Sequence, residues 1–167
     1  MVQQKVLFNS DECDYILSHA EAFEPYSYYE QPEFILELDD QLKSMLFDKF
    51  KVFGLQYFPA YIKFLRYHEG IHFNLHRDSK GEDGRIKTIS LQLSNSDDYE
   101  GGDLHIRESE HVVNSTNSSY HFNRDKGNAI IYSAQQLHEV TKITKGVRYV
   151  MVTWLQHYHL KLDKTFI

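Results

Sequence analysis

Residues 86–93 alternate between apolar and polar side chains, and this alternation constrains the fold more than any other stretch. Successive side chains of an extended strand point to opposite faces, so each class gathers on one face. The apolar face would hold Ile89, Leu91 and Leu93, and the polar face Thr88, Ser90 and Gln92. A two-faced strand in a small β-rich body predicts that the polar face lines a cavity.

Helices are expected early in the chain and strands later. An edge strand is predicted within residues 1–8, followed by a short helix with Asn9, Ser10 and Asp11 as N-cap candidates. Apolar residues at helical spacing predict a longer helix from Phe34 to about Gly54. After Pro59 the period becomes two, which predicts strands at residues 60–67, 86–93, 103–106, 120–123, 129–132, 137–143 and 148–155.

This order of elements favours an α+β fold in which a closed jelly roll is backed by N-terminal helices. A chain of 167 residues suits one domain that buries roughly 70% of its unfolded surface. We therefore expect a single domain over residues 1–167, with residues 1–58 as mostly helical support and residues 59–156 as the β-rich core.

Composition narrows the range of partners. The net charge is −6 and no block of Lys and Arg stands out, which argues against a nucleic-acid partner. Cys13 is the only cysteine, so neither a disulfide within the chain nor a cysteine-rich zinc site can form. The N-terminus has no signal-peptide pattern, and no apolar run approaches the roughly 20 residues of a membrane helix. These features predict a cytoplasmic protein without a membrane association.

Three dispersed residues form a candidate metal site. His76 and Asp78 are two positions apart, so on one strand both side chains reach the same point. His138 lies in a later predicted strand and is the best third ligand. Two imidazoles and one carboxylate are the facial set of non-haem Fe(II) oxygenases. Arg148 opens the last predicted strand, and a buried guanidinium there would need an anion.

At these residues the sequence resembles the 2-oxoglutarate/Fe(II) dioxygenases, and within them the prolyl 4-hydroxylase-like branch. It looks closest to small bacterial and phage members, which carry Arg and not Lys at the basic position. The resemblance covers about residues 60–155. Its matching residues are Leu65-Arg66-Tyr67, Gly70, His76-x-Asp78, Arg85, Thr88, Leu93, Tyr99-x-Gly-Gly-Asp-Leu104, Gly127, His138-x-Val-x-x-Ile143, Gly146, Arg148 and Trp154.

The resemblance implies a double-stranded β-helix that holds Fe(II) on His76, Asp78 and His138, with 2-oxoglutarate and O2 as co-substrates and ascorbate as an additive in vitro. Arg148 would pair with the C5 carboxylate of 2-oxoglutarate. Gln92 stands where the family commonly has an assisting Tyr. Thr88, Tyr67 and Gln92 itself remain the candidates for this assisting role, with Tyr67 and Thr88 ranked above Gln92.

The implied reaction is hydroxylation of an unactivated C–H bond, with release of succinate and CO2. An amino acid, a peptidyl residue such as proline, and a small metabolite all fit as substrate. Asp78 favours hydroxylation over halogenation, because related halogenases have Gly or Ala there. Arg66 and Arg85 can meet an acidic substrate or pair with the chain's own carboxylates, and the second reading is favoured. Trp154 can wall the pocket or pack in the core.

Three alternative functions remain. A cupin-like metal-dependent enzyme would not use 2-oxoglutarate, and Arg148 argues against it. A sensing module would hold a metal and a dicarboxylate without turnover. A nucleic-acid demethylase is disfavoured, because Trp154 occupies the position of that branch's second Arg. The loops expected to select the substrate are residues 69–75, 79–85 and 108–119. The sequence leaves the substrate and the oligomeric state open.

Overall fold

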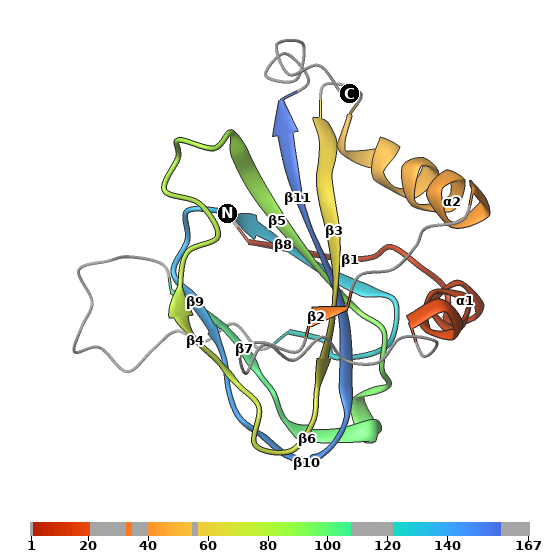
Figure 1. Cartoon of the computed structure of the whole chain (residues 1–167), viewed down its shortest axis with the longest axis vertical. Coiled ribbons are helices and arrows are strands. Elements are labelled where there is room, and N and C mark those ends of the chain that lie inside the picture. The colour runs from red at the N-terminus through yellow and green to blue at the C-terminus, as the bar shows by residue number, and fades with distance from the viewer. Residues whose placement is uncertain (1, 21–32, 35–39, 55–56, 108–121, 158–167) are drawn as a thin grey trace.

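The computed structural model describes residues 2–20, 33–34, 40–54, 57–107 and 122–157 (Figure 1). Its helices come early and its strands dominate the rest of the chain. In chain order the elements are β1 (Gln3–Val6), α1 (Ser10–Ala20), β2 (Glu33–Phe34), α2 (Asp40–Phe50), the 3-10 helix η1 (Lys51–Phe53), β3 (Tyr57–Tyr67), β4 (Phe73–His76), β5 (Arg85–Gln92), the 3-10 helix η2 (Ser96–Asp98), β6 (Tyr99–Gly101), β7 (Leu104–Ile106), β8 (Asn128–Ser133), β9 (His138–Val140), β10 (Ile143–Gly146) and β11 (Arg148–His157).

The strands of the described residues form a large sheet and two smaller ones, and their pairings are antiparallel. The large sheet has six strands in the order β1-β8-β5-β11-β3-β2. Opposite it lie the three-stranded sheet β4-β9-β7 and the two-stranded sheet β10-β6 (Figure 1). Neighbours in the large sheet are distant in sequence, as in a jelly roll. The predicted fold, a double-stranded β-helix backed by N-terminal helices, is confirmed.

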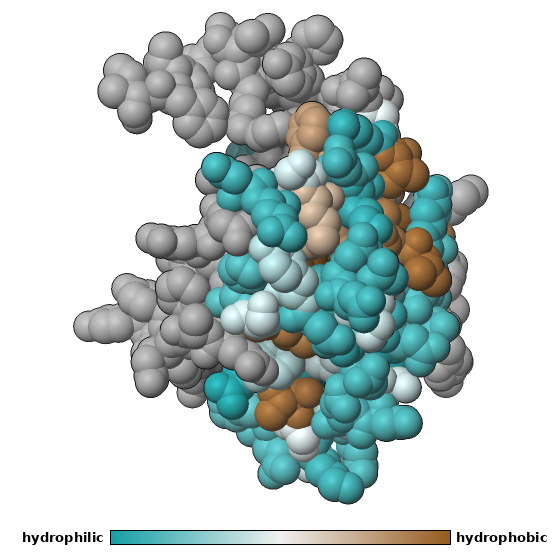
Figure 2. Space-filling view, turned by 90° about the vertical axis from the view of Figure 1, so that its right-hand side faces the viewer, coloured by the Kyte–Doolittle hydropathy of each residue, from teal (hydrophilic) through white to brown (hydrophobic). Residues whose placement is uncertain are grey.

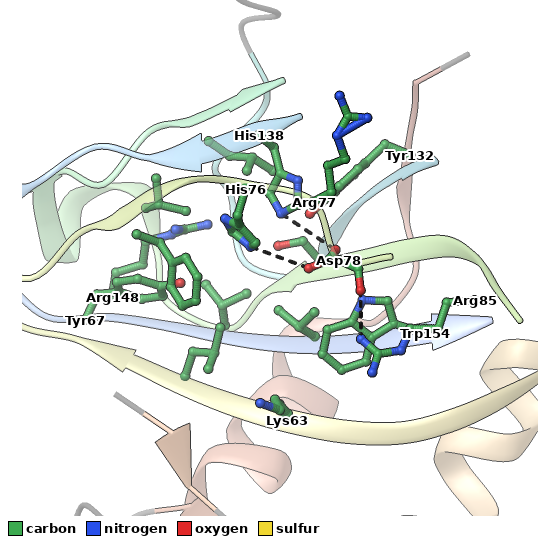
Figure 3. A pocket seen from close by; sticks show the side chains of 17 residues that line it. Lys63, Tyr67, His76, Arg77, Asp78, Arg85, Tyr132, His138, Arg148 and Trp154 are labelled. Atoms are coloured by element: carbon green, nitrogen blue, oxygen red, sulfur yellow. Dashed lines mark hydrogen bonds and ion pairs between the residues drawn. The ribbon is translucent and has the colours of Figure 1, made fainter. Parts of the chain in front are cut away.

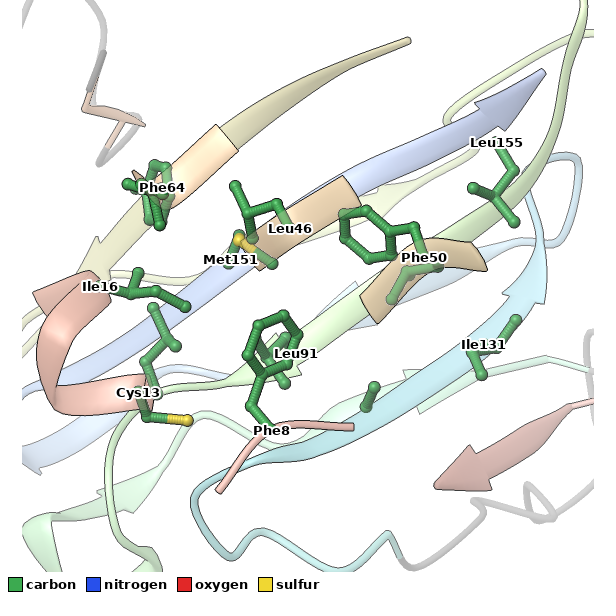
Figure 4. Close-up of a cluster of buried hydrophobic side chains, with 14 residues drawn as sticks. Phe8, Cys13, Ile16, Leu46, Phe50, Phe64, Leu91, Ile131, Met151 and Leu155 are labelled. Carbon is green, nitrogen blue, oxygen red and sulfur yellow. The ribbon is translucent and has the colours of Figure 1, made fainter. Parts of the chain in front are cut away.

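The helices cover the outer face of the large sheet. Ile16 of α1 and Leu46 of α2 pack against Leu91 of β5 and Met151 of β11 in one apolar cluster (Figure 4). The helix side of the molecule is largely hydrophilic, with apolar residues in separated patches (Figure 2). Each helix therefore buries one apolar stripe and turns its polar face to water.

A second apolar cluster fills the space between the large and small sheets. Leu65 and Val150 of the large sheet meet Leu104 and Val140 of the three-stranded sheet there. The two clusters lie on opposite faces of β5 and β11, so the large sheet separates them. The predicted two-faced strand is confirmed: β5 turns Leu91 to the helices and Ser90 to the pocket described below.

The start of the first helix and the end of the second helical segment have identifiable causes. Asn9 caps α1, because its side-chain oxygen accepts the N–H of Glu12 at 2.9 Å while the Glu12 carboxylate accepts the N–H of Asn9 at 2.8 Å. The predicted longer helix began too early. Phe34 lies in β2, opposite Phe64 of β3, and α2 begins at Asp40. The helical segment ends at Phe53, followed by Gly54 with φ of 97°.

Two sequence predictions placed the strands too coarsely. The sequence predicted no strand at residues 99–101, where β6 pairs with β10. The single strand predicted over residues 137–143 is divided, with β9 and the start of β10 in different sheets. The predicted edge strand at the N-terminus is confirmed as β1. Residues 108–119 and part of 120–123 lie outside the described residues, and the single-domain boundaries stay a prediction. None of the described helices combines the length and apolarity that crossing a bilayer requires.

Candidate metal and co-substrate site

The three predicted metal ligands come together between the sheets. His76 ends β4 and His138 begins β9, and the two residues are opposite each other in the antiparallel pair. His76 Nε2 lies 3.5 Å from Asp78 Oδ1, and His138 Nε2 lies 3.6 Å from Asp78 Oδ2 (Figure 3). One donor atom from each of the three residues lies within 4.8 Å of the others. Such a cluster can enclose a single cation.

Asp78 reaches this cluster from a bend and not from the strand that the sequence predicted. The strand β4 ends at His76, and the backbone turns at Asp78. The next residue, Ser79, donates its N–H to the backbone oxygen of Ala134 at 2.9 Å, which ties the bend to the loop before β9. The two-residue spacing thus brings the side chains together, although by a different local geometry.

Backbone carbonyls orient both imidazoles. Nδ1 of His76 lies 2.7 Å from the backbone oxygen of Asn74, and Nδ1 of His138 lies 2.9 Å from that of Gln136. A carbonyl oxygen only accepts hydrogen bonds, so each Nδ1 carries the proton. Each Nε2 then presents a lone pair to the cluster, as a metal-binding imidazole must.

The electrostatics of the cluster favour an ionised carboxylate between the two rings. Burial raises the pKa of Asp78, but the interactions with His76 and His138 in their protonated states and a hydrogen bond from Thr88 outweigh it and hold the pKa below its usual range. Burial lowers the pKa of His138. Burial also acts to lower the pKa of His76, but the hydrogen bonds that its protonated ring makes to Asp78 and Asn74 dominate and raise it.

Thr88 contacts one of the three metal-ligand candidates. Its hydroxyl donates a hydrogen bond to Asp78 Oδ2 and so holds the carboxylate in place. Sequence reasoning had ranked Thr88 among the residues that assist Arg148. Thr88 lies opposite Trp154 in the pairing of β5 with β11, which places it six residues along β11 from Arg148. This register explains why its hydroxyl serves Asp78.

Arg148 is almost fully enclosed, with 1% of its surface exposed. Its Nε donates to Gln92 Oε1 at 3.2 Å. Its guanidinium carbon lies 5.4 Å from the ring centre of Tyr67 and 5.9 Å from that of Tyr99. Among the described residues, Nη1 of Arg148 is buried without a hydrogen-bond partner. A buried guanidinium with a donor to spare fits a carboxylate, as 2-oxoglutarate would supply.

Of the three candidates to assist Arg148, Gln92 makes the direct hydrogen bond and Tyr67 makes the ring contact. The sequence ranking had placed Gln92 last. The cross-strand register accounts for the contact, since Gln92 is opposite Val150, two residues from Arg148 on the same face of the sheet.

Tyr132 is a pocket residue that the sequence analysis missed. It is buried, lies edge-on to His138 with ring centres 4.9 Å apart, and shares a hydrogen bond with Thr88. Burial and the nearby charge of Asp78 raise its pKa well above the usual value. Tyr132 lies opposite Thr88 in the sheet, and this strand register is a long-range feature that no local sequence pattern contains.

A pocket of about 240 Å³ extends from the three metal-ligand candidates to Arg148. Trp154 lines it, which decides between the two readings of that residue. Arg148 also borders a second cavity of about 290 Å³. The side chains around the first pocket are Lys63, Leu65, Tyr67, Phe73, His76, Arg77, Asp78, Arg85, Ser90, Leu104, Tyr132, His138, Val140, Arg148, Val150, Val152 and Trp154.

Two imidazoles and a carboxylate inside a jelly roll, beside a buried arginine, define the class of non-haem Fe(II) oxygenase folds. Comparison with known proteins specifies the family. Residues 62–156 match the 2OG-Fe(II) oxygenase superfamily, in which 2OG denotes 2-oxoglutarate, and the chain belongs to this family. The cofactors that the family implies, Fe(II), 2-oxoglutarate and O2, are those expected from the sequence.

Curated relatives support the predicted branch. A PKHD-type hydroxylase of Sphingopyxis alaskensis is 34% identical over 137 residues, covering 77% of this chain and 56% of the relative. A PKHD-type hydroxylase of Picosynechococcus is 35% identical over 95 residues, covering 56% of this chain and 40% of the relative. The chain thus spans about half the length of the curated relatives it matches.

Solved structures share the fold at low identity. A viral collagen prolyl hydroxylase from Paramecium Bursaria Chlorella virus-1, crystallised with 2OG, gives a TM-score of 0.68 at 16% identity, covering 93% of this chain and 95% of that one. A Pseudomonas putida prolyl-4-hydroxylase gives a TM-score of 0.62 at 15% identity, covering 93% and 92%. The predicted resemblance to the 2-oxoglutarate/Fe(II) oxygenases is confirmed by the family match, and these solved structures show that the fold is shared.

Proposed function

We propose that this protein is an Fe(II)- and 2-oxoglutarate-dependent hydroxylase that acts on an unactivated C–H bond of an amino acid, a peptidyl residue or a small metabolite. The observation that carries the proposal is the buried Arg148, with a spare donor at Nη1, in the same pocket as three converging metal-ligand candidates. A metal site alone would suit many proteins, whereas the added carboxylate receptor suits a chelating dicarboxylate.

His76, Asp78 and His138 would hold the iron. When bound, Fe(II) and 2-oxoglutarate would supply O2 activation, in which 2-oxoglutarate is converted to succinate and CO2, one oxygen atom of O2 enters succinate and the other enters the substrate C–H bond. The chain contributes the positions of the ligands. Thr88 fixes the Asp78 carboxylate, and the backbone carbonyls at Asn74 and Gln136 set the tautomers of the two imidazoles.

Arg148 would grip the C5 carboxylate of the co-substrate, and Gln92 would hold the guanidinium in position. Tyr67 lies against the guanidinium and shields it from water. Low exposure strengthens a charge-assisted hydrogen bond, because the surrounding dielectric is low. Asp78 supports hydroxylation over halogenation, since a carboxylate at the third ligand position leaves no space there for a halide.

The proposal is tested by measuring succinate release with Fe(II) and 2-oxoglutarate, comparing the wild-type chain with Arg148→Ala. Removing one partner of a buried charge pair lowers binding affinity by a factor of about thirty or more. The concentration of 2-oxoglutarate required for half-maximal turnover should therefore rise by at least about that factor. Iron binding should be spared, because Arg148 is not in the ligand cluster. Arg148→Lys, which keeps the charge and loses the fork, guards against a folding defect and should fall in between.

Arg107→Ala is the matched control, since Arg107 pairs with Glu139 and does not line the pocket. Unchanged 2-oxoglutarate affinity in Arg148→Ala would contradict the assigned role. Wild-type protein that binds iron but never forms succinate would favour the cupin-like or sensing alternatives. Slow O2 consumption without a substrate would argue against the sensing module.

The cytoplasmic location and the exclusion of nucleic-acid partners stay predictions from the sequence. Small molecules, peptides and proteins all remain candidate substrates within this proposal. The chain's acidic balance and the absence of a Lys/Arg block support the exclusion of nucleic acid.

A further inference from the structure

The pocket has two different ends. Arg148 and Tyr67 lie at one end and Trp154 and Arg85 at the other, with the metal-ligand candidates between them (Figure 3). Trp154 follows Arg148 by six residues on β11, which corresponds to about 20 Å along a strand. The proposed function assigns the Arg148 end to 2-oxoglutarate. The Trp154 end is therefore the part of the pocket left for the substrate.

Lys63 brings a cation into this pocket from an unusual position. Lys63 is two residues before Leu65 and four before Tyr67 on β3, so the three side chains share the inward face of the large sheet. It lies opposite Val152 of β11 and is half-buried. A lysine in an inward row of apolar and aromatic residues works against packing, and such local conflicts are typical of functional sites.

Arg85 adds a second cation, held in a fixed position. Its guanidinium carbon lies 4.9 Å from the ring centre of Trp154, and its Nη1 donates to the backbone oxygen of Asp78 at 2.9 Å. Its Nε pairs with Asp83 at 3.1 Å, but Asp83 is not among the residues that line the pocket. Contacts on several sides restrict the guanidinium, so binding a ligand would cost it little conformational entropy.

The described side chains that line the pocket include more cations than carboxylates. The charges of Fe(II) and Arg148 would be offset by Asp78 and the two carboxylates of 2-oxoglutarate. Lys63, Arg85 and Arg77 also line the pocket, and Asp78 is the only carboxylate among the described lining residues. Arg77 is held at the rim by the backbone oxygen of Gln135 at 3.1 Å. Each of these cations has contacts within the protein, and the excess concerns only the charge that borders the pocket.

We propose that the substrate carries a carboxylate that binds between Lys63 and Arg85 at the Trp154 end of the pocket. This inference rests on the proposed function. A guanidinium can bind a carboxylate through two parallel hydrogen bonds, and an ammonium adds a point charge. The pocket volume of about 240 Å³ is below the roughly 300–1,000 Å³ of sites for drug-sized ligands, so the acid is small or is a single residue of a peptide.

The test compares acids with their neutral amides. The proteinogenic L-amino acids and their primary amides would be assayed for stimulation of succinate release by the Fe(II)-loaded protein. Binding of the same compounds would be followed by ligand-detected NMR on protein loaded with Zn(II), which has no redox chemistry, with 2-oxoglutarate present. We expect at least one acid to bind and to stimulate, with its amide weaker by about tenfold or more, as for a lost charge-assisted hydrogen bond.

Lys63→Gln and Arg85→Gln should each remove most of the preference for the acid in both readouts. Lys63→Gln is the cleaner variant, because Arg85 also contacts the backbone of Asp78. Lys145→Gln, at an exposed lysine paired with Glu100, is the matched control and should keep the preference. A second arm uses N-acetylated, C-amidated Asp and Glu residues, and binding in this arm alone would assign the carboxylate to a peptide side chain.

Amides that work as well as acids would overturn the inference, as would an acid preference that survives in both Lys63→Gln and Arg85→Gln. The same holds if no acid of either arm binds. These results leave the proposed function standing as long as the protein converts 2-oxoglutarate to succinate. Failure of that conversion in every condition would instead overturn the proposed function.

Discussion

The outer face of the large sheet packs against the helices and its inner face borders the pocket, although the same strands form both faces. The outer face of β5 and β11 presents Leu91 and Met151 to the helices, and both side chains are fully buried. The inner face of the same strands presents Ser90 and Arg148 to the pocket. Alternation along a strand allows this division, because neighbouring residues point in opposite directions. Stability can thus be concentrated on one face and chemistry on the other.

The largest expected effect concerns the pocket that the inner face borders. His138→Ala should lower the affinity for iron more than about a hundredfold, beyond the loss expected from changing an outer-shell partner, and should abolish succinate release. The free energy of unfolding of the metal-free protein should change much less than the free energy of iron binding. Iron titration and chemical denaturation measure the two quantities.

His19→Ala is the control for that experiment, because His19 lies on α1 and is bonded to the backbone oxygen of Tyr15. It should bind iron like the wild-type chain. If His138→Ala kept the iron affinity of the wild-type chain, the three-residue cluster would not be the metal site, and the pocket side would have no assigned chemistry.

Adjacent residues of β5 sharpen the comparison. Leu91→Ala should lower the free energy of unfolding by about 2–5 kcal/mol, because it opens a cavity between the sheet and the helices. Ser90→Ala, one residue away on the opposite face, should cost less than about 1 kcal/mol. Denaturant titration of both variants measures the difference. Equal losses would mean that the pocket face contributes as much to stability as the core face.

The smallest effect is a pH dependence on the outer face. Burial raises the pKa of Cys13 from 9.0 to about 12. The folded state therefore favours the neutral thiol, and its stabilising contribution is complete below pH 9 and is lost as the pH rises towards 12. The loss is at most about 1.4 kcal/mol per pH unit.

Denaturation curves of the wild-type chain and Cys13→Ala are recorded at about pH 8 to 11, which covers part of this pKa shift. The difference between the two proteins measures the loss of stability that Cys13 causes. The variant should lose this component of the pH dependence while keeping that of the other titrating groups. Parallel curves for the two proteins would show that Cys13 is not shielded as the structure indicates.

Much of the fold follows from local patterns. The alternation in residues 86–93 predicted both faces of β5, and the capping candidate Asn9 was correct because a cap depends only on its neighbours in sequence. The start of α2 was wrong because Phe34 fits a helical pattern equally well. Its pairing opposite Phe64 is a long-range contact that no local pattern contains.

The candidate site was predictable in its chemistry and not in its internal contacts. His76, Asp78, His138 and Arg148 were recognisable from residue type and spacing. The roles of Thr88, Gln92 and Tyr132 depend on which residues are opposite each other across β5, β8 and β11. That register is set by packing of the whole sheet.

The sequence by itself determined the α+β jelly roll, the two-faced strands and the set of metal-ligand candidates, because periodicity and ligand chemistry are properties of single segments. Only the tertiary structure decided that Gln92 holds Arg148, that Thr88 holds Asp78, and that Lys63 and Arg85 both border the pocket. The physical reason is that these contacts join segments far apart in the chain, and their partners are selected by the pairing of strands.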